Sequence, residues 1–180
     1  MKRILLYILV AMTAMVVTSC LGNSVEDEYK DWREANDEWF TKQKANTDYY
    51  TTITAPWDYN GQVLMHWYND TMRTRTNLRP LFSSTVDVKY RGMTKDATPF
   101  DSSYLRTSPA DSIFRVKLNT SSLVEGWSVA IMRMHIGDSC RVVIPYTLGY
   151  GSYKMSDVIR PYTNLVFDIK LVDIYAYETK

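Results

Sequence analysis

The second half of the chain alternates between apolar and polar residues with a period of two. In Val86-Asp87-Val88-Lys89-Tyr90 every second side chain is apolar, which places these side chains on one face of a β-strand. Gly92 is expected to end this strand. Similar runs predict strands at residues 63–68, 86–90, 113–118, 139–144 and 165–175.

A short stretch within this region has helical spacing instead. Its apolar side chains recur three and four positions apart, and it follows the turn-forming residues 119–122. The pattern predicts a helix over residues 123–134, with Leu123, Trp127, Ala130, Ile131 and Met134 as its apolar positions. One short central helix among antiparallel strands predicts an α+β domain over residues 60–180.

A second helix is expected ahead of this domain, at residues 25–47. Ser24 is suited to cap it, and Tyr29, Trp32 and Trp39 belong to an apolar stripe with spacings of three and four. The stripe could pack on the chain's own domain, pair with a second copy in a homodimer, or hold another protein. We favour packing on its own domain, because the stripe is short for a coiled coil.

The first 19 residues have the features of a targeting segment. Lys2 and Arg3 precede an apolar run over residues 4–17, which is too short to span a membrane stably. The run ends in Val17-Thr18-Ser19-Cys20, which resembles a bacterial lipobox. That resemblance implies lipidation of Cys20 after cleavage, with residues 20–59 forming a lipidated tether and an amphipathic helical segment.

Export is predicted whether or not Cys20 carries lipid, since an ordinary secretory signal peptide is the alternative reading. With the lipid, the protein is expected in the bacterial cell envelope, anchored to a membrane and facing the periplasm or the surface. Cys140, the only other cysteine, then has no disulfide partner. It alternates with Val142 and Ile144, which indicates a small core residue.

Composition and the absence of some motifs narrow the classes of function that this sequence can serve. The hydrophobic fraction of 46% is enough for a sizeable core, and a formal net charge of +1 gives no support for nucleic-acid binding. His66 and His135 are isolated from each other and from the cysteines, so no metal site is expected. Neither a phosphate-binding loop nor a Gly-x-Ser-x-Gly motif is present, and no cofactor is predicted.

Val124-Glu125-Gly126-Trp127 is the most informative stretch. A tryptophan at the start of a short apolar helix can floor a pocket, and the glycine before it permits close backbone approach. Considered singly, Trp127 and the aromatic residues on the strands are more typical of a core. Taken together, however, we expect Trp127 and five other aromatic residues to converge on one apolar cavity. The five are Tyr90, Phe100, Phe114, Tyr150 and Phe167.

Seven motifs occur in one order along the chain. They are VDVKYRG at 86–92, FDSS at 100–103, VEGW at 124–127, M-x-x-G-D at 134–138, IPYTLGYG at 144–151, I-x-P at 159–161 and NLVFDIKL at 164–171. Together they resemble the FKBP-type peptidyl-prolyl cis-trans isomerases over about residues 63–174. The resemblance implies a twisted antiparallel sheet wrapped around one short helix.

The resemblance also implies a substrate pocket and its residues. Trp127 is expected to form the floor, and Tyr150 to offer its hydroxyl to a carbonyl group. Asp101 is expected at the edge, held by Tyr90 and Arg106. Backbone N–H groups of Val124 and Ile159 would serve as further donors. The implied walls are formed by Tyr90, Phe100, Phe114, Val124, Ile159 and Phe167.

The chemistry implied is rotation about X–Pro bonds in exported proteins, which needs no nucleophile, metal or cofactor. Proline-containing polypeptides are the expected clients, and macrocycles such as rapamycin the expected inhibitors. The alternatives are a binding module that holds proline segments without turnover, and a chaperone or assembly subunit. Departures from the family pattern lie at Gly149, at Arg160 and at Lys95-Asp96-Ala97.

Overall fold

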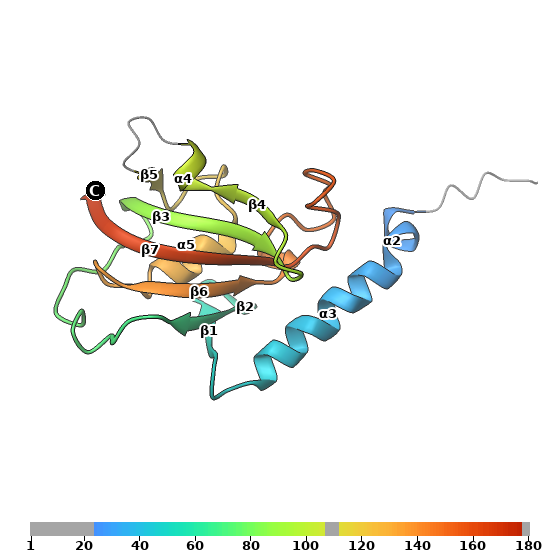
Figure 1. Cartoon of the computed structure of the whole chain (residues 1–180), viewed down its shortest axis with the longest axis horizontal. Coiled ribbons are helices and arrows are strands. Elements are labelled where there is room, and N and C mark those ends of the chain that lie inside the picture. The colour runs from blue at the N-terminus through green and yellow to red at the C-terminus, as the bar shows by residue number, and fades with distance from the viewer. Residues whose placement is uncertain (1–23, 107–111, 178–180) are drawn as a thin grey trace, which may run out of the picture.

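The computed structural model describes residues 24–106 and 112–177, and its centre is one antiparallel sheet (Figure 1). The described strands are hydrogen-bonded in the order β1-β2-β6-β7-β3-β4, and β5 pairs with β3. Their bounds are β1 Thr51–Ala55, β2 Asp58–Trp67, β3 Thr85–Thr94, β4 Pro99–Ser102, β5 Phe114–Lys117, β6 Ser139–Ile144 and β7 Leu165–Ala176. Strands that are hydrogen-bonded to each other in the sheet run antiparallel, which confirms the predicted fold class.

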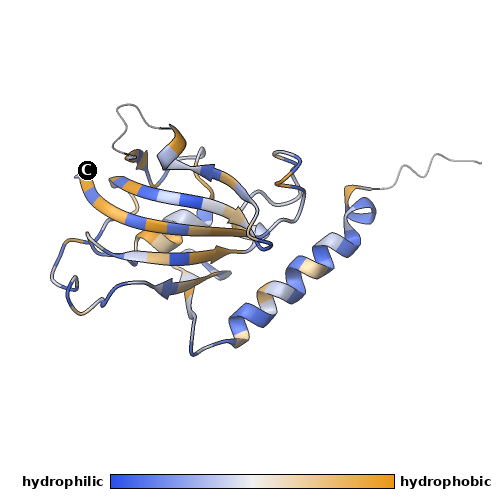
Figure 2. Cartoon of the chain, in the orientation of Figure 1, coloured by the Kyte–Doolittle hydropathy of each residue, from blue (hydrophilic) through white to orange (hydrophobic). Residues whose placement is uncertain are grey.

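The short helix α5, Glu125–Ile131, packs on one face of the sheet and lies behind it in Figure 1. Gly126 permits this contact, because a Cβ atom there would lie 2.4 Å from Cγ2 of Ile144 on β6. Trp127 and Ile131 face a single apolar core that includes Met65, Val88 and Ile169. Every second residue of β3, β6 and β7 points into this core, and polar residues are interspersed among the apolar ones along β7 after its first three residues (Figure 2).

The opposite face carries a second, smaller apolar cluster, and the N-terminal helix covers it. Tyr50, Leu64, Val143 and Val166 are buried there against Trp39 and Phe40. Consecutive residues of β2 therefore serve different clusters, because Val63 and Met65 face α5 and Leu64 faces the N-terminal helix. Packing on the chain's own domain, the role favoured for this helix, is confirmed.

The N-terminal helix differs from its predicted form. It consists of α2, Val25–Glu28, and α3, Lys30–Ala45, separated at Tyr29. Ser24 begins α2 with a capping box, since its hydroxyl accepts from the Asp27 N–H and the Asp27 carboxylate accepts from the Ser24 N–H. Two further short elements are α4, Ser103–Arg106, and the 3₁₀ turn η1, Tyr146–Leu148.

Several predicted boundaries require correction. The sheet already begins at Thr51, before residue 60, where the domain was expected to start. Gly92 does not end its strand but lies within β3. The glycine permits close packing there, because a Cβ atom would come within 2.7 Å of both Phe100 and Phe167. The central helix is also shorter than predicted, ending at Ile131.

A glycine and a buried carboxylate stabilise the turn that leads into β6. Gly137 has a φ of +96°, which explains the glycine in the M-x-x-G-D motif. The Asp138 carboxylate, fully buried, accepts hydrogen bonds from Asn69, Thr74 and the His135 N–H.

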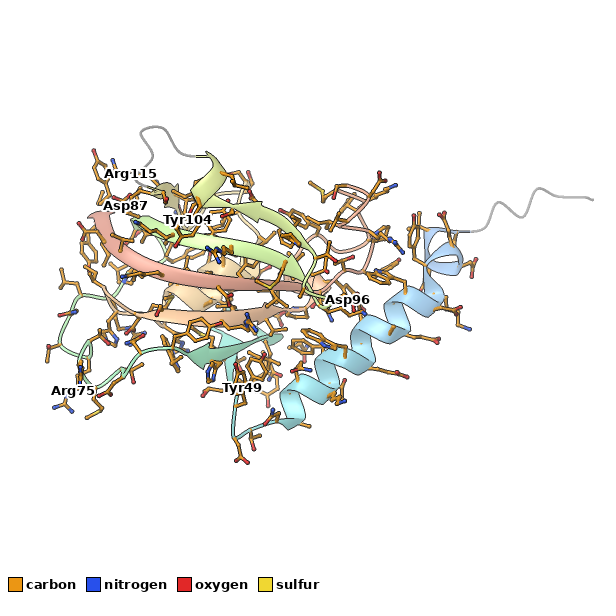
Figure 3. All side chains as sticks on the ribbon, in the orientation of Figure 1. Tyr49, Arg75, Asp87, Asp96, Tyr104 and Arg115 are labelled. Carbon is orange, nitrogen blue, oxygen red and sulfur yellow. The ribbon has the colours of Figure 1, made fainter. Side chains whose placement is uncertain are left out.

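Figure 3 labels Arg115 and Asp87 on the neighbouring strands β5 and β3, where two hydrogen bonds of 2.7 and 2.8 Å join them.

Among the described residues, no helix combines the length and apolar character needed to cross a membrane.

Candidate active site

A cavity of about 260 Å³ lies between the start of α5, the strands β3, β4, β5 and β7, and the loop that leads into β7. Its lining is largely aromatic and aliphatic. The residues are Tyr90, Phe100, Asp101, Phe114, Ser122, Leu123, Val124, Trp127, Tyr150, Met155, Ser156, Ile159 and Phe167. A cavity lined mainly by aromatic and aliphatic residues, with a few polar groups, is the usual form of a small binding site.

Trp127 is the central aromatic residue of this cavity and is only 2% exposed. Its ring makes edge contacts with Tyr90 at 4.9 Å and Phe167 at 5.1 Å between centroids, at 84° and 86° between the ring planes. Phe100 contacts Phe167 in the same manner at 5.5 Å. Edge-to-face packing of this kind holds each ring in one orientation, so the walls are preformed.

Asp101 is the acidic residue of the cavity. Its carboxylate accepts a hydrogen bond of 2.8 Å from the Tyr90 hydroxyl and another of 2.8 Å from the Ser102 N–H. β4 pairs with β3 so that Asp101 lies opposite Gly92, two residues from Tyr90. This register brings the side chains of Tyr90 and Asp101 together. The expected contact between Tyr90 and Asp101 is therefore present. The side chain of Arg106, expected to contact the same carboxylate, lies outside the described residues.

The rim formed by residues 150–159 is closed by local hydrogen bonds. The Ile159 carbonyl accepts from the N–H groups of Met155 and Ser156 at 3.0 and 3.2 Å. The Ile159 N–H donates to the Ser156 hydroxyl at 3.0 Å. The donor that the family resemblance assigns to a ligand is therefore already engaged by a serine in this chain.

The structure brings nine of the ten predicted pocket residues to this one cavity, and their roles in binding remain predictions. The remaining one is Arg106, and Cys20 lies outside the described residues. Sequence reasoning missed four lining residues: Ser122, Leu123, Met155 and Ser156. Ser122 and Leu123 directly precede Val124, and Met155 and Ser156 lie within four residues of Ile159, which is the signal that could have indicated them.

The described part of the chain contains no group of three or more histidine, cysteine, aspartate or glutamate side chains that could hold a metal ion. Cys140 is buried beside Met134, with 3.7 Å between the sulfur atoms. Burial raises the pKa of the Cys140 thiol, and nearby Asp138 raises it further. The thiol is therefore protonated at neutral pH and packs as a core residue.

Comparison with known proteins identifies the family of this fold and cavity. The family model for FKBP-type peptidyl-prolyl cis-trans isomerases matches residues 79–172, about half of the chain. The chain belongs to this family. The match includes all the lining residues of the cavity, from Tyr90 to Phe167.

Relatives of this FKBP-type chain come from several organisms. FK506-binding protein 2 of Kluyveromyces lactis is 41% identical over 90 residues, covering 49% of this chain and 61% of that protein. The macrophage infectivity potentiator of Trypanosoma cruzi is 37% identical over 95 residues, covering 53% and 45%. The chain therefore spans less than two thirds of the length of these relatives.

Two solved structures share the fold over most of the chain. A peptidyl-prolyl cis-trans isomerase from Pseudomonas syringae has a TM-score of 0.65 at 25% identity, covering 81% of this chain and 95% of its own. FkpA from Escherichia coli has the same TM-score and identity, covering 83% and 62%. Both structural matches are longer than the family model match, so the likeness extends beyond the isomerase motifs.

Proposed function

We propose that this protein is a peptidyl-prolyl cis-trans isomerase that accelerates rotation about X–Pro bonds in exported polypeptides. The observation that carries the proposal is the convergence of Tyr90, Trp127 and Phe167 on one cavity that also holds Asp101. The family match supports the same activity. Binding of proline segments without turnover is the competing function, and the first experiment below separates the two.

The reaction suits a rigid apolar pocket. Rotation about an X–Pro bond has a barrier of about 20 kcal/mol and takes roughly 10 to 100 s unaided. In the twisted state the amide loses resonance, so its carbonyl is less polar and its need for water is smaller. A water-poor aromatic cavity therefore favours the twisted state over the planar one, which lowers the barrier by differential binding.

Asp101 contributes electrostatics and organisation. Its carboxylate is held by Tyr90 at 2.8 Å at the edge of the cavity, and no proton has to move during rotation of the amide. A fixed negative charge there stabilises the altered charge distribution of the twisted amide. Each tenfold gain in rate needs about 1.4 kcal/mol of such stabilisation, which a few contacts can supply.

The first test is an NMR exchange assay on a short peptide with a hydrophobic residue before proline. Wild type is compared with Asp101→Ala and Phe167→Ala, which remove the carboxylate and one wall of the cavity. Asp173→Ala is the control, since Asp173 is exposed on β7 away from the cavity. We expect catalysis in wild type, at least a tenfold loss in both cavity variants, and no loss in the control.

A folded wild type that gives no acceleration with several residues before proline would contradict isomerase activity. Retained peptide binding would then favour the non-catalytic binding module. Rapamycin gives a second readout, because a macrocycle that fills the aromatic cavity should protect the protein from thermal unfolding. This protection should be lost in Phe167→Ala.

The location of the activity is part of the proposal. The lipobox-like Val17-Thr18-Ser19-Cys20 supports a lipid anchor, which would place the isomerase in the bacterial cell envelope. Lipidation is tested by labelling cells with an alkyne-bearing fatty acid. Label on wild type and none on Cys20→Ser is expected, and equal label on both would contradict the anchor.

A further inference from the structure

A second cavity adjoins the first one on the outer side of α5. Its volume is about 260 Å³, and apolar side chains come to it from three separate parts of the chain. Trp57 lies in the turn between β1 and β2, Phe82 lies just before β3, and Leu118 follows β5. Polar residues complete the lining: Asn119, Thr120, Glu125 and Ser128.

Trp57 and Phe82 are exposed although they are large and apolar. Their side chains are 44% and 46% exposed, and their ring centroids lie 4.8 Å apart. The indole N–H of Trp57 donates a hydrogen bond to the carboxylate of Glu125, the first residue of α5. Trp57 is therefore held in place beside the helix that forms the floor of the active-site cavity, with one part of the ring left open.

The two cavities border each other at one residue. Leu123 lines both of them, so its side chain forms the ridge between the proline pocket and the Trp57–Phe82 cavity. Glu125, which holds Trp57, directly follows Val124 of the proline pocket. A polypeptide whose proline occupies the first cavity has to cross only this ridge to reach the second.

We propose that the Trp57–Phe82 cavity is a subsite for an apolar side chain of the same polypeptide whose proline is bound at Trp127. This inference rests on the proposed function. Only the Leu123 side chain separates the two cavities, so a few residues of extended chain, at roughly 3.3 Å per residue, bridge them. The subsite therefore selects clients that carry an aromatic or large aliphatic residue that far from the proline.

The form of the cavity favours a peptide segment over a second copy of the chain. A stable protein–protein interface buries about 800 Å² on each partner, whereas this cavity accommodates a side chain or two. Asn119 and Thr120 also line it, and their polar side chains can bind the backbone N–H and C=O groups that an extended peptide presents. Trp57 precedes the region matched by the family model, so that match does not account for this residue of the subsite.

The test compares two peptides in the exchange assay with the purified full-length protein. One is a four-residue peptide that fills only the proline pocket. The other is a longer peptide with a phenylalanine three residues from the proline, made in versions with this residue on either side. The variants are Trp57→Ala and Phe82→Ala, and the control is Tyr59→Ala, an 87% exposed aromatic residue on β2 outside both cavities.

We expect kcat/KM for one of the long peptides to fall about three- to tenfold in Trp57→Ala and Phe82→Ala. Short-peptide values should stay within twofold of wild type, and Tyr59→Ala should change neither. Equal losses with both lengths would overturn the subsite, because they would show an effect on the proline pocket itself. No loss with either long peptide would also overturn it.

A binding readout keeps the test independent of catalysis. The indole N–H signal of Trp57, identified by its absence in Trp57→Ala, should shift when the long peptide is titrated and stay in place with the short one. If wild type lacks turnover, this shift still supports the subsite while the isomerase proposal fails. An unmoved signal with a bound long peptide, or a dimer that Trp57→Ala dissociates, would overturn the subsite.

Discussion

Asn164 donates two hydrogen bonds to Asn36, although the residues are 128 positions apart and both side chains are fully buried. The Asn164 N–H meets Oδ1 of Asn36 at 2.9 Å, and Nδ2 of Asn164 meets the Asn36 carbonyl at 2.6 Å. Asn36 also donates to the Trp32 carbonyl, and Asn164 accepts from the Tyr146 N–H. The N-terminal helix is thus joined to the segment that leads into β7, which ties it to one wall of the candidate active-site cavity.

Replacing Asn36 should therefore destabilise the whole domain. Asn36→Ala leaves the buried N–H of Asn164 without its acceptor, which costs about 1–3 kcal/mol in the free energy of unfolding. Urea unfolding followed by tryptophan fluorescence measures the change. Glu38→Ala, an exposed position on the same helix, is the control. A loss below about 0.5 kcal/mol in Asn36→Ala would show that the helix is not part of the cooperative unit.

The sequence could predict the strands and the pocket because both rest on repeated local signals. The strand over residues 139–144 agrees with β6 at both ends, and the alternation at 86–90 lies inside β3. The pocket followed from seven motifs in register. The docking of α3 could not be predicted in detail, because its anchor, Asn36, is a polar residue within an apolar stripe and its partner lies far along the chain.

Two further features escaped sequence reasoning for the same reason. The sequence pattern predicts a strand end at Gly92, whereas the role of this glycine depends on aromatic rings from two other strands. Ala97, in the stretch that departs from the family pattern, adopts a φ of +59° although it is not a glycine, so local propensity does not decide the backbone there. Figure 3 shows the neighbouring Asp96 at this turn. Its partner Lys95 lies over the Trp32 ring of α3, at 5.1 Å from the ring centroid.

Gly92→Ala should damage the candidate active-site cavity more than the fold. The new methyl group would lie 2.7 Å from both Phe100 and Phe167, so the two rings have to move apart. Overpacking of this kind typically costs 1–3 kcal/mol in stability, and we expect at least a tenfold fall in kcat/KM. The exchange assay and thermal unfolding measure the two effects.

Gly61→Ala is the matched control, since Gly61 also lies in a strand but its new methyl group would meet side-chain atoms at 3.0–3.3 Å, away from the cavity. We expect near-normal activity in this variant. Equal activity in Gly92→Ala and wild type would contradict the view that the spacing of Phe100 and Phe167 defines the pocket.

Ser156→Ala should strengthen the binding of macrocycles such as rapamycin. In this chain the Ile159 N–H donates to the Ser156 hydroxyl, so a ligand carbonyl has to displace that acceptor. A hydrogen bond contributes about 0.5–1.5 kcal/mol net, and its removal from the free protein should lower Kd by roughly two- to tenfold. Isothermal titration calorimetry gives Kd, with Ser152→Ala in the same loop as the control. An unchanged or weaker affinity would show that the Ile159 N–H does not contact the ligand.

Asp168 should make stability depend on pH in the acid range. Burial by itself would raise the pKa of Asp168, but hydrogen bonds from Arg141 at 2.8 and 3.0 Å and from Tyr68 at 2.6 Å outweigh burial and lower it. The pKa of Asp168 is lower in the folded state than in the unfolded state. The pairing therefore stabilises the fold fully at pH values above the unfolded-state pKa of about 3.9. This stabilisation is lost as pH falls through the folded-state pKa.

The difference in unfolding free energy between wild type and Asp168→Asn isolates this effect. It should be largest at pH 6–7 and constant there, and should shrink below about pH 4 as the carboxylate takes up a proton. Asp173→Asn, on the same strand but exposed, should show no such trend. A difference that grows as the pH falls would mean that the protonated form of Asp168 is the stabilising one. That result would contradict the lowered pKa of Asp168 and its explanation by charge-assisted hydrogen bonds from Arg141.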